Sequence, residues 1–235
     1  MSPNEHARSY ADAARLLEAV GDALEQACRS AIRARGAAWL ALAGGRTPLP
    51  VYARLARTAF DGRIDALPTD ERCVPHDHPA CNLRQLRTAF GDSPAMRLHP
   101  ITRADGDVAA SLALAQATLA ERPGDFDAVL LGMGADGHIA SLFPGAANLA
   151  QGMAPGSGID ALATVPDPLP PEAPFARISL TLPRLLRARE IHLVVTGEEK
   201  RAVLQRVLRE PQGGLPVCGL LQAPSPPPIR IHWSP

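Results

Sequence analysis

The sequence predicts an α/β protein built on one doubly wound, mostly parallel sheet with helices on both faces, a Rossmann-like three-layer arrangement. Short apolar runs alternate with helix-length segments along the 235 residues. The runs lack the period-2 alternation of a half-exposed strand, as expected when both faces of each strand are buried. Turns rich in glycine or charge follow several runs, which is typical of strand-to-helix connections. The length suffices for a large core, and we expect a single domain over 1–235.

The expected elements follow one another in order. Residues 9–34 place Ala, Leu and Val at helical spacing with charges between them, which predicts an amphipathic helix that ends near Gly36. By the same criterion, further helices are expected at 50–60, 82–90, 107–121, 183–188 and 198–210. Apolar runs predict strands at 37–43, 64–68, 126–132, 176–183, 190–197 and 229–233. Residues 144–174 are rich in Gly and Pro and are expected to be irregular.

The composition favours small-molecule chemistry. The 24 basic residues balance 24 acidic ones, so neither nucleic acid nor a membrane surface is expected as a partner. No apolar run approaches the ~20 residues of a membrane helix, and MSPNEHARSY lacks the features of a signal peptide, so we expect a cytoplasmic protein. The four cysteines are scattered and are expected to be free thiols. Lys200 is the only lysine in the chain.

The turn after the first expected strand, Gly44-Gly45-Arg46-Thr47-Pro48, is a candidate phosphate site. In open α/β sheets ligands bind beyond the carboxyl ends of the strands. Thr47 is suited to cap the next helix and Pro48 to occupy its first position. The two glycines would let backbone N–H groups face an anion at the positive end of that helix. The alternative is an ordinary glycine turn followed by a capped helix.

Two more turns at strand ends concentrate charge. In Thr69-Asp70-Glu71-Arg72, the guanidinium could bind phosphate or carboxylate oxygens, with Asp70 or Glu71 orienting it or accepting sugar hydroxyls. A solvated loop is the plainer explanation. Lys200 falls in the first turn of the helix expected at 198–210, where a cation opposes the helix dipole unless an anion meets it. Pairing with Glu198 or Glu199 in solvent is the alternative.

The stretch GMGADGHIASLFPG, residues 132–145, contains G-x-G-x-x-G after an expected strand. A dinucleotide site would need an uninterrupted helix after the glycines and an acidic residue ~20 positions on, at the end of the next strand. Pro144 would interrupt the helix required after the glycines. The region near 157 is a loop rich in Gly and Pro, so it offers no strand that ends in an acidic residue. The sequence therefore argues against dinucleotide binding.

His138 remains as the candidate catalytic group of this stretch. Histidine titrates near neutrality and can activate a water molecule, while Asp136 can fix its tautomer or bind substrate. Ser141 lacks the G-x-S-x-G surroundings of a nucleophile. Two alternatives stay open on the residues alone: a histidine without a catalytic role, and a metal site formed by Asp136, His138 and the cluster His76, Asp77 and His78.

Four blocks, GGRTP, TDERCVPHDHPACN, FDAVLLGMGADGHIASLFPG and VTGEEK, resemble in order and spacing the motifs of the glucosamine-6-phosphate isomerase/6-phosphogluconolactonase family, over about residues 10–233. The resemblance implies hydrolysis of 6-phospho-D-glucono-1,5-lactone to 6-phospho-D-gluconate in the pentose phosphate pathway, without metal or organic cofactor. It is similar to the family's lactonases rather than its isomerases, because the isomerases carry a glutamate where this chain has Phe143. The isomerase, and a non-catalytic sugar-phosphate-binding domain, are the alternatives.

The resemblance also implies residue roles. His138 would be the base for the attacking water, and Asp136 and Asp70 would hold the histidine or sugar hydroxyls. Arg72 and Lys200 would contact the phosphate or developing negative charge, with Arg177 a further candidate. Gly44, Gly45 and Thr47 would form the backbone cradle, and Arg46 stands where the family often has a serine. A small sugar-phosphate lactone is the expected partner, and a monomer or weak homodimer is the expected state.

Overall fold

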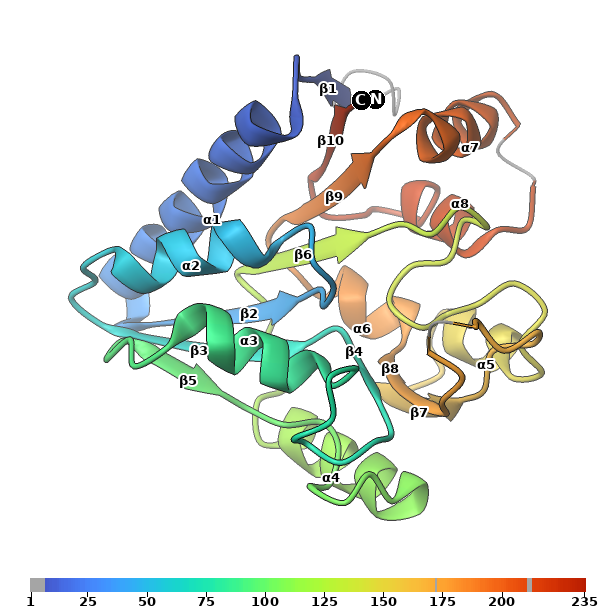
Figure 1. The fold of residues 1–235 in the computed structure, drawn as a ribbon, viewed down its shortest axis with the longest axis horizontal. Helices are drawn as coiled ribbons and strands as arrows, with labels where there is room; N and C mark the ends of the chain where they lie inside the picture. Colours follow the sequence, from blue (N-terminus) through green and yellow to red (C-terminus); the bar gives the residue numbers. More distant parts are fainter. Residues whose placement is uncertain (1–6, 172, 211–212) are drawn as a thin grey trace.

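The computed structural model describes residues 7–171, 173–210 and 213–235. Its centre is a seven-stranded sheet with the order β1-β10-β9-β6-β2-β3-β5. Every neighbouring pair in this sheet is parallel (Figure 1). Its strands are β1 (Ala7–Ser9), β2 (Ala37–Leu42), β3 (Arg63–Pro68), β5 (Met96–Leu98), β6 (Ala128–Gly132), β9 (Ile191–Thr196) and β10 (Ile229–Ser234). The predicted doubly wound parallel sheet is confirmed.

Helices cover both faces of this sheet. One face carries α1 (Ala13–Arg35), α2 (Leu49–Arg57) and α3 (Asn82–Phe90). The other carries α4 (Val108–Ala120), α6 (Leu182–Leu186), α7 (Glu198–Arg209) and α8 (Pro216–Leu221). Successive residues of β2 point to opposite faces, so Leu40 and Leu42 enter the first core and Trp39 and Ala41 enter the second. Burial on both faces explains why the strand sequences are apolar throughout.

A second, three-stranded antiparallel sheet corrects part of the expected strand arrangement. It has the order β4-β8-β7, formed by β4 (Asp70–Arg72), β8 (Arg177–Leu180) and β7 (Ala161–Thr164). The strand expected at 176–183 therefore lies outside the main sheet and ends early, because Thr181 caps α6 by accepting a hydrogen bond from the Arg184 N–H. The region 144–174, expected to be irregular, contains β7 and the short helix α5 (Leu149–Met153).

The order in which the chain adds strands to the main sheet changes direction between the neighbouring strands β2 and β6. From β2 it proceeds to β3 and β5 on one side, whereas from β6 it proceeds to β9 and β10 on the other. The loops that leave β2 and β6 therefore diverge at the carboxyl ends of these neighbouring strands, where open α/β sheets form a ligand crevice. This is where the fold predicts a ligand site.

No helix within 7–171, 173–210 and 213–235 combines the length and apolarity needed to cross a membrane. Residues 1–6, most of the stretch judged to lack a signal peptide, lie outside the described residues. All four cysteines are free, as expected.

Candidate active site

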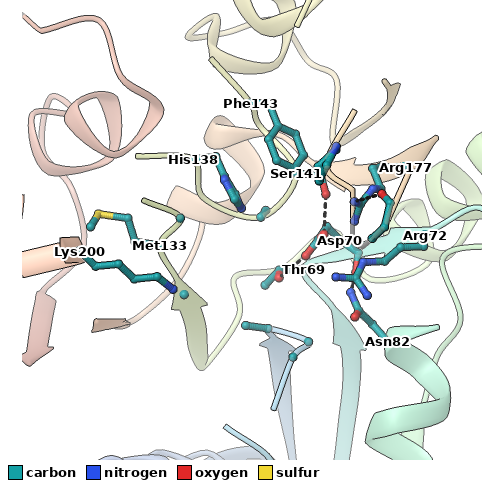
Figure 2. Close-up of a pocket in the computed structure, with 18 residues that line it drawn as sticks. Thr69, Asp70, Arg72, Asn82, Met133, His138, Ser141, Phe143, Arg177 and Lys200 are labelled. Carbon is teal, nitrogen blue, oxygen red and sulfur yellow. Dashed lines mark hydrogen bonds between the residues drawn. The ribbon is translucent and has the colours of Figure 1, made fainter. Parts of the chain in front are cut away.

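A cleft of about 350 Å³ opens at the crevice between β2 and β6 (Figure 2). The loop after β2 contributes Gly44 and Gly45, and the segment after β6 contributes Gly132, Gly134 and His138. Most of the predicted site residues line it: Gly44, Gly45, Asp70, Arg72, His138, Arg177 and Lys200. Residues that are more than 150 positions apart in the chain thus share one cavity because parallel strands end at the same edge.

His138 and Asp136 form a hydrogen-bonded pair at the cleft. The ring Nδ1 lies 2.6 Å from Asp136 Oδ1, which also accepts from the His138 backbone N–H at 3.1 Å. Burial raises the pKa of Asp136, but the hydrogen bond and charge of His138 outweigh it, so this pKa lies below its ordinary value. An ionised Asp136 fixes the proton on Nδ1, which leaves the Nε2 lone pair free to accept a proton. This is the geometry of a general base with its orienting carboxylate.

Gly134, the second glycine of G-x-G-x-x-G, makes room for this pair. A Cβ at position 134 would lie 2.2 Å from His138 Nδ1 and 2.5 Å from Asp136 Oδ1. By contrast, a Cβ on Gly132 would meet nothing within 4 Å. Gly137 has a positive φ of 80°, which only glycine adopts readily. The glycines of this stretch therefore shape the loop that carries the histidine, in agreement with the argument against a dinucleotide site.

Phe143 packs against the catalytic candidate. Its ring centroid lies 4.3 Å from that of His138 with the planes inclined by 37°. The Arg177 guanidinium lies over the other part of the same ring, 5.8 Å from the centroid. At the position where the family's isomerases carry a glutamate, this chain thus places an apolar wall that restrains the imidazole and cannot transfer a proton.

Arg72 and Arg177 are paired across the second sheet and both face the cleft. Their hydrogen bonds go to backbone carbonyls: Arg72 Nη1 donates to Ala80 O, and Arg177 donates to Phe175 O and Ala173 O. The Nε of Arg72 is buried and has no hydrogen-bond partner among the residues that the structure describes. Burial lowers the pKa of Arg177, the charge of Asp70 opposes this shift, and the neighbouring Arg72 adds to it. Two guanidinium groups with no carboxylate bonded to them form a site for an anion or for developing negative charge.

Asp70 lines the cleft with a largely buried side chain that is held by the chain itself. It is 8% exposed, and Ser141 Oγ donates to its Oδ2 at 2.5 Å while Thr69 Oγ1 lies 3.3 Å from Oδ1. Both oxygens of this carboxylate are therefore occupied by hydroxyls of the chain itself. Each of these oxygens can accept a further hydrogen bond, so the expected role of Asp70 as a ligand of sugar hydroxyls stays a prediction.

Glu71, which was considered as a partner of Arg72 or of substrate, instead supports the start of α3. It is fully buried, and its carboxylate accepts backbone N–H groups of Arg72, Asn82 and Leu83 at 2.6–2.7 Å. Burial raises the pKa of Glu71, while these hydrogen bonds act in the opposite direction. The capped helix places Asn82 in the cleft wall, where its Nδ2 donates to Asp70 O.

The glycine turn departs from the prediction in its cap. Helix α2 begins after Pro48, and Thr47 makes no capping hydrogen bond. The reason is that Pro48 itself takes the cap position in a helical conformation and leaves Thr47 one residue too early. Gly44 is required at its position, since a Cβ there would lie 2.0 Å from Asn82 Oδ1. The N–H of Gly45, expected to face an anion, donates to Gln85 Oε1 at 3.0 Å.

A smaller cavity of about 170 Å³ adjoins the cleft on the far side of the glycine turn. It is lined by Gly44, Gly45, Arg46, Thr47, Thr196 and Lys200, among others. Arg46 and Thr47, absent from the main cleft, thus belong to this compartment. In the described part of the chain, the backbone N–H groups of Gly44, Arg46 and Thr47 donate no hydrogen bond, so they stay available.

Lys200 lines both cavities from the first turn of α7. Within the described residues it forms no ion pair and no hydrogen bond, whereas Glu198 pairs with Arg201. Pairing of Lys200 with Glu198 or Glu199, the plainer explanation of its position, is therefore not observed. Figure 2 shows the ammonium extended toward the β6 end of the cleft.

The histidine cluster considered for a metal site is dispersed. Among the residues that the structure describes, no three His, Cys, Asp or Glu side chains come together in a group suited to a metal ion. His76 directs its Nε2 to Thr102, with both the carbonyl and the hydroxyl oxygen at 3.1 Å. The metal hypothesis thus has no ligand set in this part of the chain.

Three side chains of the cleft wall were missed as site residues. Asn82, Ser141 and Phe143 line the cavity, whereas from the sequence Ser141 is considered only as a nucleophile and Phe143 only as a replacement for glutamate. Asn82 opens a helix whose pattern gives no sign that its first residue faces a ligand. Ser141 could have been found from its place three residues after His138, once the strand pairing that brings it to Asp70 was known.

Comparisons with known proteins agree with this geometry. The family described as glucosamine-6-phosphate isomerases/6-phosphogluconolactonase matches residues 11–229. The chain is 36% identical over 225 residues to a 6-phosphogluconolactonase of Caulobacter vibrioides, covering 93% of each chain. It is 35% identical over 207 residues to one of Mycobacterium tuberculosis, covering 81% of each.

Among solved structures, a 6-phosphogluconolactonase of Shewanella baltica superposes with a TM-score of 0.87 at 28% identity, over 97% of each chain. The family match spans nearly the whole sequence and includes every block that carries the cleft. The chain therefore belongs to the glucosamine-6-phosphate isomerase/6-phosphogluconolactonase family.

Proposed function

We propose that this protein hydrolyses 6-phospho-D-glucono-1,5-lactone to 6-phospho-D-gluconate in the oxidative pentose phosphate pathway. The observation that carries the proposal is one cleft that holds an oriented base, His138 with Asp136, together with cations that form no ion pair within the described residues. A lactone phosphate needs these two things: an activated water molecule and a positively charged site. The relatives that share most of the chain's length are named for this activity.

The reaction follows from the position of His138. Its Nε2 takes a proton from water, whose oxygen attacks the lactone carbonyl carbon, and negative charge develops on the carbonyl oxygen. The guanidinium groups of Arg72 and Arg177 are the candidates to stabilise that charge. When the intermediate collapses, the bond from carbon to the ring oxygen breaks, and the imidazolium returns its proton to that oxygen. Asp136 stabilises the imidazolium that forms in between.

The phosphate belongs, in this proposal, in the smaller compartment beside the glycine turn. Lys200 supplies a full positive charge there, and the N–H groups of Gly44, Arg46 and Thr47 are free to donate. Oriented backbone N–H groups and a lysine together are well suited to hold phosphate oxygens. The sugar ring then extends from this compartment toward His138 in the larger cleft.

Phe143 argues against the isomerase alternative. Ring opening of an amino sugar needs a proton carrier beside the histidine, and a phenyl ring 4.3 Å from His138 occupies that place. A non-catalytic sugar-phosphate-binding domain would not need the oriented pair of His138 and Asp136. We also propose that the enzyme works in the cytoplasm on its small-molecule substrate alone, as a single domain. The predictions of a monomer or weak dimer, and of no nucleic-acid, membrane, metal or cofactor partner, stay predictions.

A direct assay tests this function. The lactone is generated in the cuvette from glucose 6-phosphate by a separate dehydrogenase, and its disappearance is followed with and without the protein, because the lactone also hydrolyses spontaneously. We expect acceleration by wild type and none above background by His138→Ala. Release of ammonia from glucosamine 6-phosphate is measured in parallel. A lactone decay equal to the spontaneous rate, or ammonia release at a comparable rate, would contradict the proposal.

A further inference from the structure

A buried hydrogen bond joins the loop that carries His138 to the strand that carries Arg72. Ser141 Oγ donates to Asp70 Oδ2 at 2.5 Å, and both residues are buried, Ser141 completely (Figure 2). The Ser141 backbone N–H is also held, by Ser179 Oγ at 3.1 Å. Ser179 faces Asp70 across the pairing of β4 and β8. The serine is thus tied at two atoms to the second sheet.

The loop that carries His138 and Ser141 is under local strain. Ala140 has a φ of 47°, a left-handed conformation that residues with a Cβ seldom adopt. Such a conformation persists only where the surrounding contacts impose it, and it is frequent at functional sites. Ser141 directly follows Ala140, and His138 lies two residues before Ala140. The contacts of Ser141 are therefore well placed to hold this turn in its strained form.

The two walls that the hydrogen bond joins carry different parts of the proposed chemistry. His138 and Asp136 come from the segment after β6 of the main sheet. Arg72 and Arg177 come from β4 and β8 of the antiparallel sheet. A base and an oxyanion site that belong to separate sheets need a fixed spacing, since a displacement of about 1 Å can cost ~10² in rate.

We propose that Ser141 is a positioning residue, which acts through Asp70 to hold the His138 loop at the right distance from Arg72. This inference rests on the proposed lactone hydrolysis. It assigns to Asp70 the role of an anchor for the loop, in place of a contact to sugar hydroxyls. Ser141 itself is no nucleophile, because its hydroxyl is buried and its hydrogen is committed to the carboxylate.

The first test compares Ser141→Ala with a matched buried serine outside the cleft. Ser111 is also fully buried, and its Oγ accepts from the Arg103 N–H. Ser141→Ala should lower kcat ~10- to 100-fold with KM changed less than ~3-fold, because alignment is lost while the phosphate compartment is intact. Ser141→Thr, which keeps the hydroxyl, should recover most of kcat, and Ser111→Ala should leave both constants near wild type. An unchanged kcat in Ser141→Ala, or a rise in KM alone, overturns the proposal.

A double-mutant cycle tests the pathway through Asp70. If Ser141 acts through that carboxylate, Asp70→Asn and Ser141→Ala together should reduce kcat no more than the worse of the two single changes. Independent, multiplying losses would refute the coupling. Should Ser141→Ala fold poorly, as judged by its thermal midpoint, Ser141→Thr and Asp70→Asn carry the comparison.

Hydrogen exchange separates this inference from the proposed function. Backbone amides of residues 139–143 should exchange at least ~10-fold faster in Ser141→Ala than in wild type or Ser111→Ala, since the loop loses an anchoring contact. This measurement needs no substrate. Unchanged exchange overturns the positioning role even in an active enzyme. Failure of wild type to hydrolyse the lactone, with exchange altered as expected, overturns the proposed function and leaves the anchoring contact established.

Discussion

The two ends of the main sheet carry similar charged side chains in different electrostatic settings. At the amino ends of the strands, a cavity of about 390 Å³ is lined by Arg35, Arg189 and Arg230 together with Asp127 and Glu190. Each of these arginines forms an ion pair with one of the two carboxylates. At the carboxyl ends, Arg72, Arg177 and Lys200 form no ion pair within the described residues.

The difference shows why composition alone cannot locate a site. The chain as a whole is neutral, and both cavities contain three basic side chains. Among the described residues, the cations at the carboxyl end have no directly bonded carboxylate, although the charge of Asp70 acts on Arg177, so an incoming anion could bind them there without displacing a carboxylate. The contrast predicts that substitutions at the carboxyl ends change activity and binding, whereas substitutions at the amino ends change stability.

The largest effect is expected at His138. His138→Ala removes the proposed base and should lower kcat by ~10² to 10⁴, while binding of 6-phosphogluconate changes little because the cations remain. Turnover is measured on lactone generated in situ, and product binding by calorimetry. A variant with wild-type kcat would show that the imidazole is not the base. Loss of product binding as severe as the loss of turnover would assign it to binding.

Two neighbouring glycines provide a matched pair at the same end. Gly134→Ala places a Cβ within 2.2 Å of His138 Nδ1 and must displace the ring. We expect a loss of ~10- to 10³-fold in kcat, since misplaced catalytic groups cost rates of that order. Gly132→Ala meets nothing within 4 Å and should stay within ~3-fold of wild type. Equal activities of the two variants would contradict the account of Gly134.

Charged groups near the amino ends of the strands should affect the stability of the protein rather than its activity, and this stability should depend on pH. Glu190 belongs to a row of hydrogen-bonded side chains. His192 is hydrogen-bonded to both Glu190 and His232, and His232 is hydrogen-bonded to Tyr10. Burial, with the positive charges of His192, Arg8 and Arg230, lowers the pKa of His232 from 6.5 to about 3. The unfolded chain therefore binds one more proton between these pH values, and the free energy of unfolding falls as the pH falls through this window.

The decrease attributable to His232 should be about 3 kcal/mol between pH 6.5 and 4, at roughly 1.4 kcal/mol per pH unit. Urea unfolding at several pH values measures it. In His232→Gln the slope over this window should flatten, whatever the absolute stability of the variant. Parallel slopes for the two proteins would show that this histidine is not the group responsible.

The smallest effects compare one cation from each end. Lys200→Met should raise KM for the phosphorylated lactone ~10- to 30-fold, because a charge-assisted contact worth roughly 1.5–2 kcal/mol is lost. Hydrolysis of the unphosphorylated gluconolactone should change little. Arg189→Met removes one of the two arginines that pair with Asp127 and should leave KM unaltered. Equal KM effects on the two lactones would remove Lys200 from the phosphate compartment.

Much of the main sheet could be predicted from sequence because its strands are buried on both faces and its helices are amphipathic. The helix expected at 82–90 matches α3 (Asn82–Phe90), and the strand expected at 64–68 matches β3 within one residue. The second sheet could not be predicted. Strand β4 consists of Asp70, Glu71 and Arg72, whose charges indicate a loop, and it forms only because β8 pairs with it from more than 100 residues away.

The site, like the fold, could be predicted only in part from the sequence. Residues at the carboxyl ends of the predicted strands, such as Gly44, His138 and Lys200, do gather at one cleft because the topology places them there. Side chains whose role depends on tertiary contacts were misassigned or missed. Thr47 was expected to cap α2 and does not, and the hydrogen bond from Ser141 to Asp70 was not foreseen. No local pattern encodes contacts of this kind.

The reversal of chain direction between β2 and β6 has a consequence for synthesis on the ribosome. The glycine turn that opens the cleft is made early, whereas Lys200 follows β9, the last of the described strands that bring residues to this site. A nascent chain could therefore form the β2–β3 half of the fold long before any cavity exists. The cleft, with both the histidine and Lys200 in its walls, would be complete only after the chain has been made through β9.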